Sequence, residues 1–119
     1  MKEKIEFKEF LEIEKKLEIK MGRIEGVQRM EGSDKMLKLS VNLGEEDLVT
    51  VMTNIGNTPG LSDNGEEDKL NLKLFPFITN LKPAKMMGVE SHAMIMVTSA
   101  EDGTIEGVSV PASPGAKIL

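Results

Sequence analysis

Strict alternation of apolar and polar side chains is the feature that most constrains how this chain can fold. It is clearest in residues 36–44, MLKLSVNLG, where single polar residues separate the apolar positions Leu37, Leu39, Val41 and Leu43. Side chains of a β-strand point alternately to its two faces, so this spacing predicts a strand with one buried face.

A similar pattern opens the stretch KKLEIKMGRIEGVQRM at residues 15–30. Leu17, Ile19 and Met21 share one face of a predicted half-buried strand. The alternation slips after Gly22, which predicts a bulge or a sharp coil at that glycine. A long first strand that bends partway suits a small closed barrel.

The remaining patterns predict one short helix, further strands and a loop. The helix is expected at about residues 7–13, and strands are expected at 47–56, 70–81 and 92–100. Because Pro76 cannot donate a ladder hydrogen bond, the strand at 70–81 is predicted to be an edge or bulged strand. Residues 56–71 read as a loop, and the tail from 104 reads as extended. These features predict an all-β, five-stranded antiparallel barrel formed by a single domain, residues 1–119.

Composition excludes several kinds of site. The 119 residues include no Cys and one His, His92, so thiol chemistry, Cys-ligated metals and His-rich metal centres are excluded. We find no catalytic motif and expect no enzyme activity, no cofactor and no metal. No run of 18 apolar residues exists, and the charged N-terminus does not resemble a signal peptide, so we expect a cytoplasmic protein without a membrane partner.

Charge is distributed unevenly along the chain. The net charge is −5, which by itself argues against a nucleic-acid partner. However, residues 45–68 carry seven acids and no base, which we interpret as a solvated loop. Residues 15–44 and 69–100 each carry an excess of three positive charges, and these two regions are able to form a basic face on an acidic protein.

Three stretches resemble one family. The first is LEIKMGRIEGVQRMEGSDKMLKLSVNLGEE, and the second, ITNLKPAKMMGVESHAMIMVTS, is similar to the pattern Asn-Leu-Lys-Pro-x-Lys-x-x-Gly-x-x-Ser-x-x-Met. The third is VPASPGAKI near the C-terminus. Together they resemble the tRNA-binding OB-fold domain, which occurs alone, appended to methionyl-tRNA synthetase, within the phenylalanyl-tRNA synthetase beta subunit and in endothelial-monocyte-activating polypeptides.

The resemblance implies an OB-fold barrel that binds tRNA regardless of its amino-acid identity. It implies a stand-alone module or a trans-acting auxiliary subunit of an aminoacyl-tRNA synthetase, with the methionyl enzyme favoured. It also implies a homodimer in which the C-terminal segment, residues 101–119, takes part. The tRNA-binding residues that match by position are Lys20, Arg23, Lys35, Asn80, Lys82, Lys85, Ser91 and Met94.

Several of these residues allow a second interpretation. Lys82 and Lys85 flank Pro83, which stiffens the loop, and they either contact phosphates or are simply solvated. Ser91 either hydrogen-bonds the RNA or caps a strand, and Met94 either stacks on a base or packs in the core. Gly88 either lets a ligand approach the backbone or supplies a turn with positive φ.

The scarcity of aromatic residues bears on the choice of ligand. The chain has four Phe and neither Tyr nor Trp; we expect Phe7 and Phe10 to pack a helix, and Phe75 and Phe77 to lie in the core. Binders of single strands usually stack bases on aromatic rings, so recognition of a folded RNA by shape is favoured. The alternative function is a chaperone-like or scaffold protein that binds polypeptide, to which a methionine-rich strand is suited.

Overall fold

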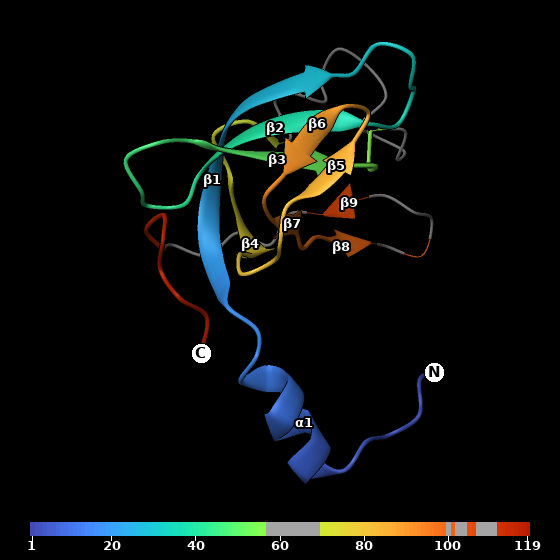
Figure 1. Cartoon of the computed structure of the whole chain (residues 1–119), viewed down its shortest axis with the longest axis vertical. Coiled ribbons are helices and arrows are strands. Elements are labelled where there is room, and N and C mark those ends of the chain that lie inside the picture. The colour runs from blue at the N-terminus through green and yellow to red at the C-terminus, as the bar shows by residue number, and fades with distance from the viewer. Residues whose placement is uncertain (57–69, 100, 102–104, 107–111) are drawn as a thin grey trace.

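The computed structural model describes residues 1–56, 70–99, 101, 105–106 and 112–119. Figure 1 shows one helix standing apart from a body of strands. In chain order the elements are α1 (Phe7–Glu14), β1 (Ile19–Arg29), β2 (Leu37–Asn42), β3 (Val49–Thr53), β4 (Leu74–Ile78), β5 (Ala84–Met86), β6 (Val89–Ser91), β7 (Met94–Ile95), β8 (Thr98–Ser99) and β9 (Ile105–Glu106). The predicted all-β class with one short helix is confirmed.

The main sheet closes into a nearly complete five-stranded barrel. Its strand order is β3-β2-β1-β4-β7, and every neighbouring pair is antiparallel. Two hydrogen bonds hold β3, at one end of this sheet, to the residues that precede β7 at the other end. The His92 N–H donates to the Thr50 carbonyl (3.0 Å), and the Met52 N–H donates to the Ser91 hydroxyl (2.9 Å). The predicted five-stranded barrel is therefore confirmed. Most of the expected loop at 56–71 lies outside the described residues.

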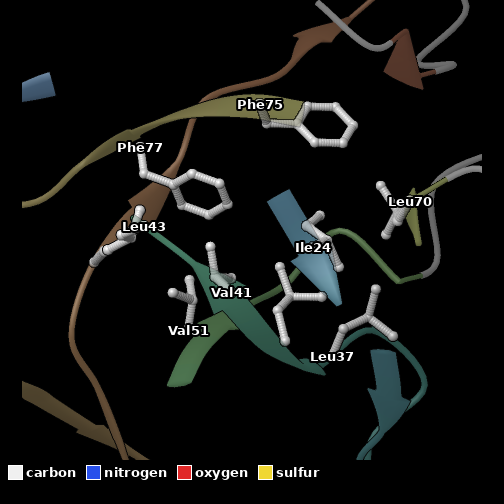
Figure 2. Close-up of a cluster of buried hydrophobic side chains, with 10 residues drawn as sticks. Ile24, Leu37, Val41, Leu43, Val51, Leu70, Phe75 and Phe77 are labelled. Atoms are coloured by element: carbon white, nitrogen blue, oxygen red, sulfur yellow. The ribbon is translucent and has the colours of Figure 1, made fainter. Parts of the chain in front are cut away.

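The core confirms the alternation in the second strand. Leu37, Leu39 and Val41 of β2 are fully buried, and Phe75 and Phe77 of β4 pack against the same cluster (Figure 2). Burial of such side chains is the main stabilising term of the barrel.

The first strand differs from its prediction in two ways. The register with β2 shifts between Ile24 and Gly26, so the bulge lies at Glu25 and not at Gly22. Gly22 instead faces the core, where an added Cβ would lie 2.7 Å from Val41 Cγ1. Side chains alternate along the strand, so Met21, next to Gly22, faces away from the core. Leu17, which was predicted to share a face with Met21, is exposed and lies before the strand begins.

The end of the C-terminal segment, residues 112–119, covers that outward face. The Met21 N–H donates to Ala116 (2.8 Å) and the Gly115 N–H donates to Met21 (2.7 Å), so Met21 is buried. Gly115 has a φ of +87°, and an added Cβ would lie 2.7 Å from the Leu43 carbonyl oxygen. The predicted extended tail is interrupted here by a turn, in which the Ala116 N–H donates to the Ser113 carbonyl (3.1 Å). Residues 102–104 and 107–111 lie outside the described part.

Two predictions about the late strands are wrong. The strand β4 is not an edge strand, since it lies between β1 and β7. Pro76 is tolerated because its ring nitrogen is on the β7 side, where pairing is limited to Phe77 and Ile78, and its carbonyl still accepts from the Met96 N–H (2.9 Å). The strand expected at 92–100 is divided into β7 and β8.

The helix α1 has the predicted position but buries no residue. Phe7 and Phe10 stack on each other with ring centroids 6.1 Å apart, and both remain exposed to solvent. The expectation that they pack the helix onto the rest of the chain is therefore wrong for a single copy. Within the described residues, no helix is long and apolar enough to cross a membrane.

Candidate nucleic-acid interface

The segment between β4 and β7 carries half of the predicted site, and its hairpin contacts β3. Its strands β5 and β6 pair from Ala84 to Ser91, and the turn between them uses Met87 (φ 51°) and Gly88 (φ 80°). Gly88 thus has the positive φ that favours glycine, and no described atom lies within 4 Å of the place where its Cβ would be. The turn interpretation of Gly88 is confirmed.

Ser91 holds this hairpin to the barrel. Its side chain is buried, accepts a hydrogen bond from the Met52 N–H (2.9 Å) and donates one to the Ala93 carbonyl (3.2 Å). With both partners inside the protein, Ser91 has a structural role in the closure of the barrel. A direct contact of Ser91 with RNA stays a prediction.

Beside the hairpin lies a groove of about 410 Å³, which we call the methionine groove. It is lined by Lys35, Met36, Met52, Thr53, Asn54, Ile55, Met86, Met94, Ile95 and Val97. Three structural units contribute to it: the turn between β1 and β2, the end of β3, and the hairpin with β7. Cofactor-sized clefts in proteins have comparable volumes and similarly apolar walls with a few polar groups.

A smaller hollow of about 100 Å³ adjoins the groove and shares Met52, Met86 and Met94 with it. Lys82 and Ser91 also line this hollow. The fold therefore brings four of the eight predicted residues together around one concave surface: Lys35, Lys82, Ser91 and Met94.

Lys85 and Asn80 belong to the same segment of the chain as Lys82, but neither lines the groove or the hollow. Lys85 is exposed on β5 and lies opposite Glu90 of β6, on the other face of the strand from Ala84 and Met86. Asn80 accepts a hydrogen bond from the Glu18 N–H (2.8 Å) and donates one to the Lys16 carbonyl (2.6 Å). Asn80 thereby fixes the chain that enters β1.

Lys20 and Arg23 lie away from the methionine groove. Lys20 lines another cavity, of about 430 Å³, where its ammonium is 3.7 Å from a Glu18 carboxylate oxygen. A hydrogen bond from the Thr79 hydroxyl (2.8 Å) lowers the pKa of Glu18 from its ordinary 4.5; burial opposes this shift, and the charges of Lys20 and Lys117 add to it. Arg23 pairs with Glu25 (3.2 Å).

Sequence reasoning missed Lys38, Met36, Met52 and Met86 as parts of this surface. Lys38 lies directly opposite Met52 in the ladder between β2 and β3. The alternation that buries Leu37 and Leu39 already places Lys38 on the outer face, which is the ligand-binding face of OB-folds. The alternation was therefore a sequence signal that could have identified Lys38. Met36 and Met86 line the same groove only because the barrel closes, which the sequence pattern does not show.

No group of three or more potential metal-ligating side chains occurs among the residues that the structure describes. His92, whose Nε2 lies 3.9 Å from a Glu90 carboxylate oxygen, is exposed at the foot of the hairpin. The residues that line the methionine groove are one cation (Lys35), two polar residues (Thr53 and Asn54) and otherwise apolar side chains.

Comparisons with known proteins identify relatives of this chain. The chain is similar to methionine–tRNA ligases: it is 36% identical to the enzyme of Archaeoglobus fulgidus over 101 residues, and 39% identical to that of Helicobacter pylori strain J99 over 88 residues. The matches cover 83% and 74% of this chain, which spans only 14% and 12% of the length of those enzymes.

Two solved structures are similar to this chain over nearly its whole length. The MetRS related protein of Pyrococcus horikoshii superimposes with a TM-score of 0.76 at 29% identity, over 99% of this chain and 100% of that one. The CsaA chaperone protein of Picrophilus torridus has a TM-score of 0.74 at 21% identity over 98% and 100%, which shows a shared fold. A family model described as "Putative tRNA binding domain" matches residues 19–117, and the chain therefore belongs to the tRNA-binding domain family.

Proposed function

We propose that the protein binds tRNA with the face that carries the methionine groove. The observation that carries this proposal is the convergence of Lys35 and Lys82, from separate loops, on one concave apolar surface. Lys38 adds a third cation on the neighbouring strand. Ammonium groups suit phosphates as point charges, so they would hold the RNA contour without reading its sequence.

We further propose that binding is the whole activity, with no chemical step, and that the module serves an aminoacyl-tRNA synthetase in trans. Its similarity to methionine–tRNA ligases favours the methionyl enzyme as the partner. A bound module raises the effective tRNA concentration near the enzyme without new contacts to the amino acid. The cytoplasmic location stays a prediction that follows from this role.

Titration with unfractionated tRNA at several salt concentrations tests the proposal. Each phosphate contact releases counterions, so affinity should fall steeply as salt rises. The double change Lys35→Ala, Lys82→Ala should weaken binding and reduce the slope of log K against log salt by about two. Lys4→Ala, Lys73→Ala removes the same charge from exposed positions outside the groove and is the matched control.

Equal losses in both double variants would contradict the assigned surface, because they would reflect net charge alone. The contacts of Lys20, Arg23 and Asn80 with tRNA remain predictions. Each of these side chains already interacts with another group of the protein. For Lys85 we expect a phosphate contact from the outer face of the hairpin, measurable with Lys85→Ala in the same titration.

A second candidate function is chaperone-like binding of polypeptide. It is favoured by the methionine lining, because Met side chains adapt to varied apolar partners. The fold is also shared with a chaperone protein. A clean absence of tRNA binding at low salt, together with capture of an unfolded polypeptide, would promote this function over the first.

We also propose that two copies form a homodimer through α1 and the C-terminal segment. An isolated helix of eight residues is marginal in water, yet α1 exposes Phe7, Phe10 and Leu11 and buries nothing. At the other end of the chain, Ile118 and Leu119 are exposed as well. A second copy would bury these apolar surfaces.

A further inference from the structure

The methionine groove has the chemistry of a site for a flat apolar group. Met52 is buried at its base, Met36 is half-buried, and Met86 and Met94 are exposed at its sides. Thioethers are polarisable and make favourable contacts with aromatic rings. A phosphate would lose its hydration against such walls without compensation, so the groove and the lysines suit different parts of a ligand.

Among the described residues, no other platform for base stacking lies beside these lysines. Phe75 and Phe77 are buried in the core, and Phe7 and Phe10 lie on α1. Proteins that hold unpaired bases normally stack them on aromatic side chains. Here methionines occupy the concave surface where such rings would be needed.

Charge and polarity identify the ligand more closely. Lys35 lines the groove and Lys82 lines the adjoining hollow, so each of the two neighbouring cavities has one cation in its lining. The hydroxyl of Thr53 and the amide of Asn54 are the polar side-chain groups that line the groove besides Lys35. A nucleotide unit has the matching arrangement: an aromatic base with polar edges, and a phosphate on either side.

We propose that the methionine groove takes one unpaired, unstacked nucleobase of the bound RNA, while Lys35 and Lys82 hold the phosphates that flank it. This inference rests on the proposed tRNA binding and names what the groove recognises. Because the walls are apolar and adaptable, the site accepts different bases and contributes affinity more than sequence selectivity.

Methyl NMR of protein labelled at the methionine methyl groups tests the proposal directly. A base that stacks on the groove shifts nearby methyl resonances upfield through its ring current. With tRNA at low salt, the methyl signals of Met36, Met86 and Met94 should move upfield. Met87 at the hairpin turn and Met21 under the C-terminal segment serve as internal controls, since neither lines the groove.

Affinity measurements add a second readout. Met86→Gln, Met94→Gln should weaken tRNA binding about tenfold, the scale of one lost stacking contact, with the salt slope unchanged. Met86→Leu, Met94→Leu keeps the apolar surface and should retain most of the affinity, and Met87→Gln is the control. A blunt-ended RNA duplex, which offers no unpaired base, should bind the glutamine variant and the wild type equally.

The outcomes separate this proposal from the one on which it rests. Groove methyls that move no more than Met87, while the lysine variants still weaken tRNA binding, would overturn the base site and leave tRNA binding intact. No binding of tRNA by the wild type at low salt would overturn both. Glutamine changes that weaken capture of an unfolded polypeptide but leave tRNA affinity unaltered would assign the groove to peptides instead.

Discussion

Among single residues, Ser91 has the clearest structural role, because its hydroxyl joins the hairpin to β3. Ser91→Ala leaves the buried Met52 N–H without its partner. An unsatisfied buried donor costs about 1–3 kcal/mol, so we expect the free energy of unfolding to fall by that amount. Urea denaturation measures it, and Ser113→Ala, a change at an exposed serine, should stay within about 0.5 kcal/mol of the wild type. A similar loss in both variants would contradict this role.

Glu18 links stability to pH. The Thr79 hydroxyl holds the pKa of Glu18 below 4.5 in the folded protein. A carboxyl whose pKa is lower in the folded than in the unfolded state stabilises the fold above the unfolded value, and this stabilisation is lost as pH falls through the folded value.

We therefore expect Glu18→Gln to be less stable than the wild type at neutral pH, and the difference to shrink as pH falls below 4.5. Urea denaturation over a pH series measures this convergence. Glu3→Gln, which changes an exposed carboxyl in the N-terminal tail, should parallel the wild type throughout. A difference that stays constant with pH would show that Glu18 does not act through its charge.

At the scale of elements, β1 is the strand on which the barrel depends. Its first half pairs with β4 on one side and with the C-terminal segment on the other, and its second half pairs with β2. The two pairings overlap at Arg23, which lies opposite Leu74 of β4 and Asn42 of β2, and the bulge follows between Ile24 and Gly26. The C-terminal segment thus completes the hydrogen bonding of a strand that would otherwise present a free edge.

Gly115→Ala should detach this segment from β1. Alanine is strained at a φ of +87°, and its Cβ would lie 2.7 Å from the Leu43 carbonyl oxygen. Amide hydrogen exchange should then speed up at Met21, whose N–H donates to Ala116. The amide of Ile24, which donates to Lys73 within the barrel, should keep its protection. Unchanged exchange at Met21 would contradict the assignment.

At the scale of the whole molecule, the acidic protein carries a local basic and apolar face, while α1 projects from the other end of β1 (Figure 1). Among the described elements, α1 is the one expected to contact another molecule, because its apolar side chains are exposed and none is buried. Because no residue of α1 is buried, changes there should leave the barrel folded.

Phe10→Gln, Leu11→Gln should convert the proposed dimer into a monomer in light scattering, with the unfolding transition of the barrel retained. Both side chains are exposed apolar groups one turn from Phe7, so their loss removes the surface that a second copy would bury. Glu9→Gln, Glu12→Gln alters the same helix at polar positions and should remain dimeric. A wild type that is already monomeric would rule the dimer out.

The sequence by itself determined the local features: the buried face of β2, the helix at α1 and the tRNA-binding family. Each follows from spacing or from a motif within one short stretch. Only the tertiary structure decided that Ser91 is buried, that Met21 lies under the C-terminal segment, and that Met36 and Met86 line one groove. The reason is physical: alternation specifies two faces of a strand, whereas burial and site geometry depend on which distant segments close the barrel.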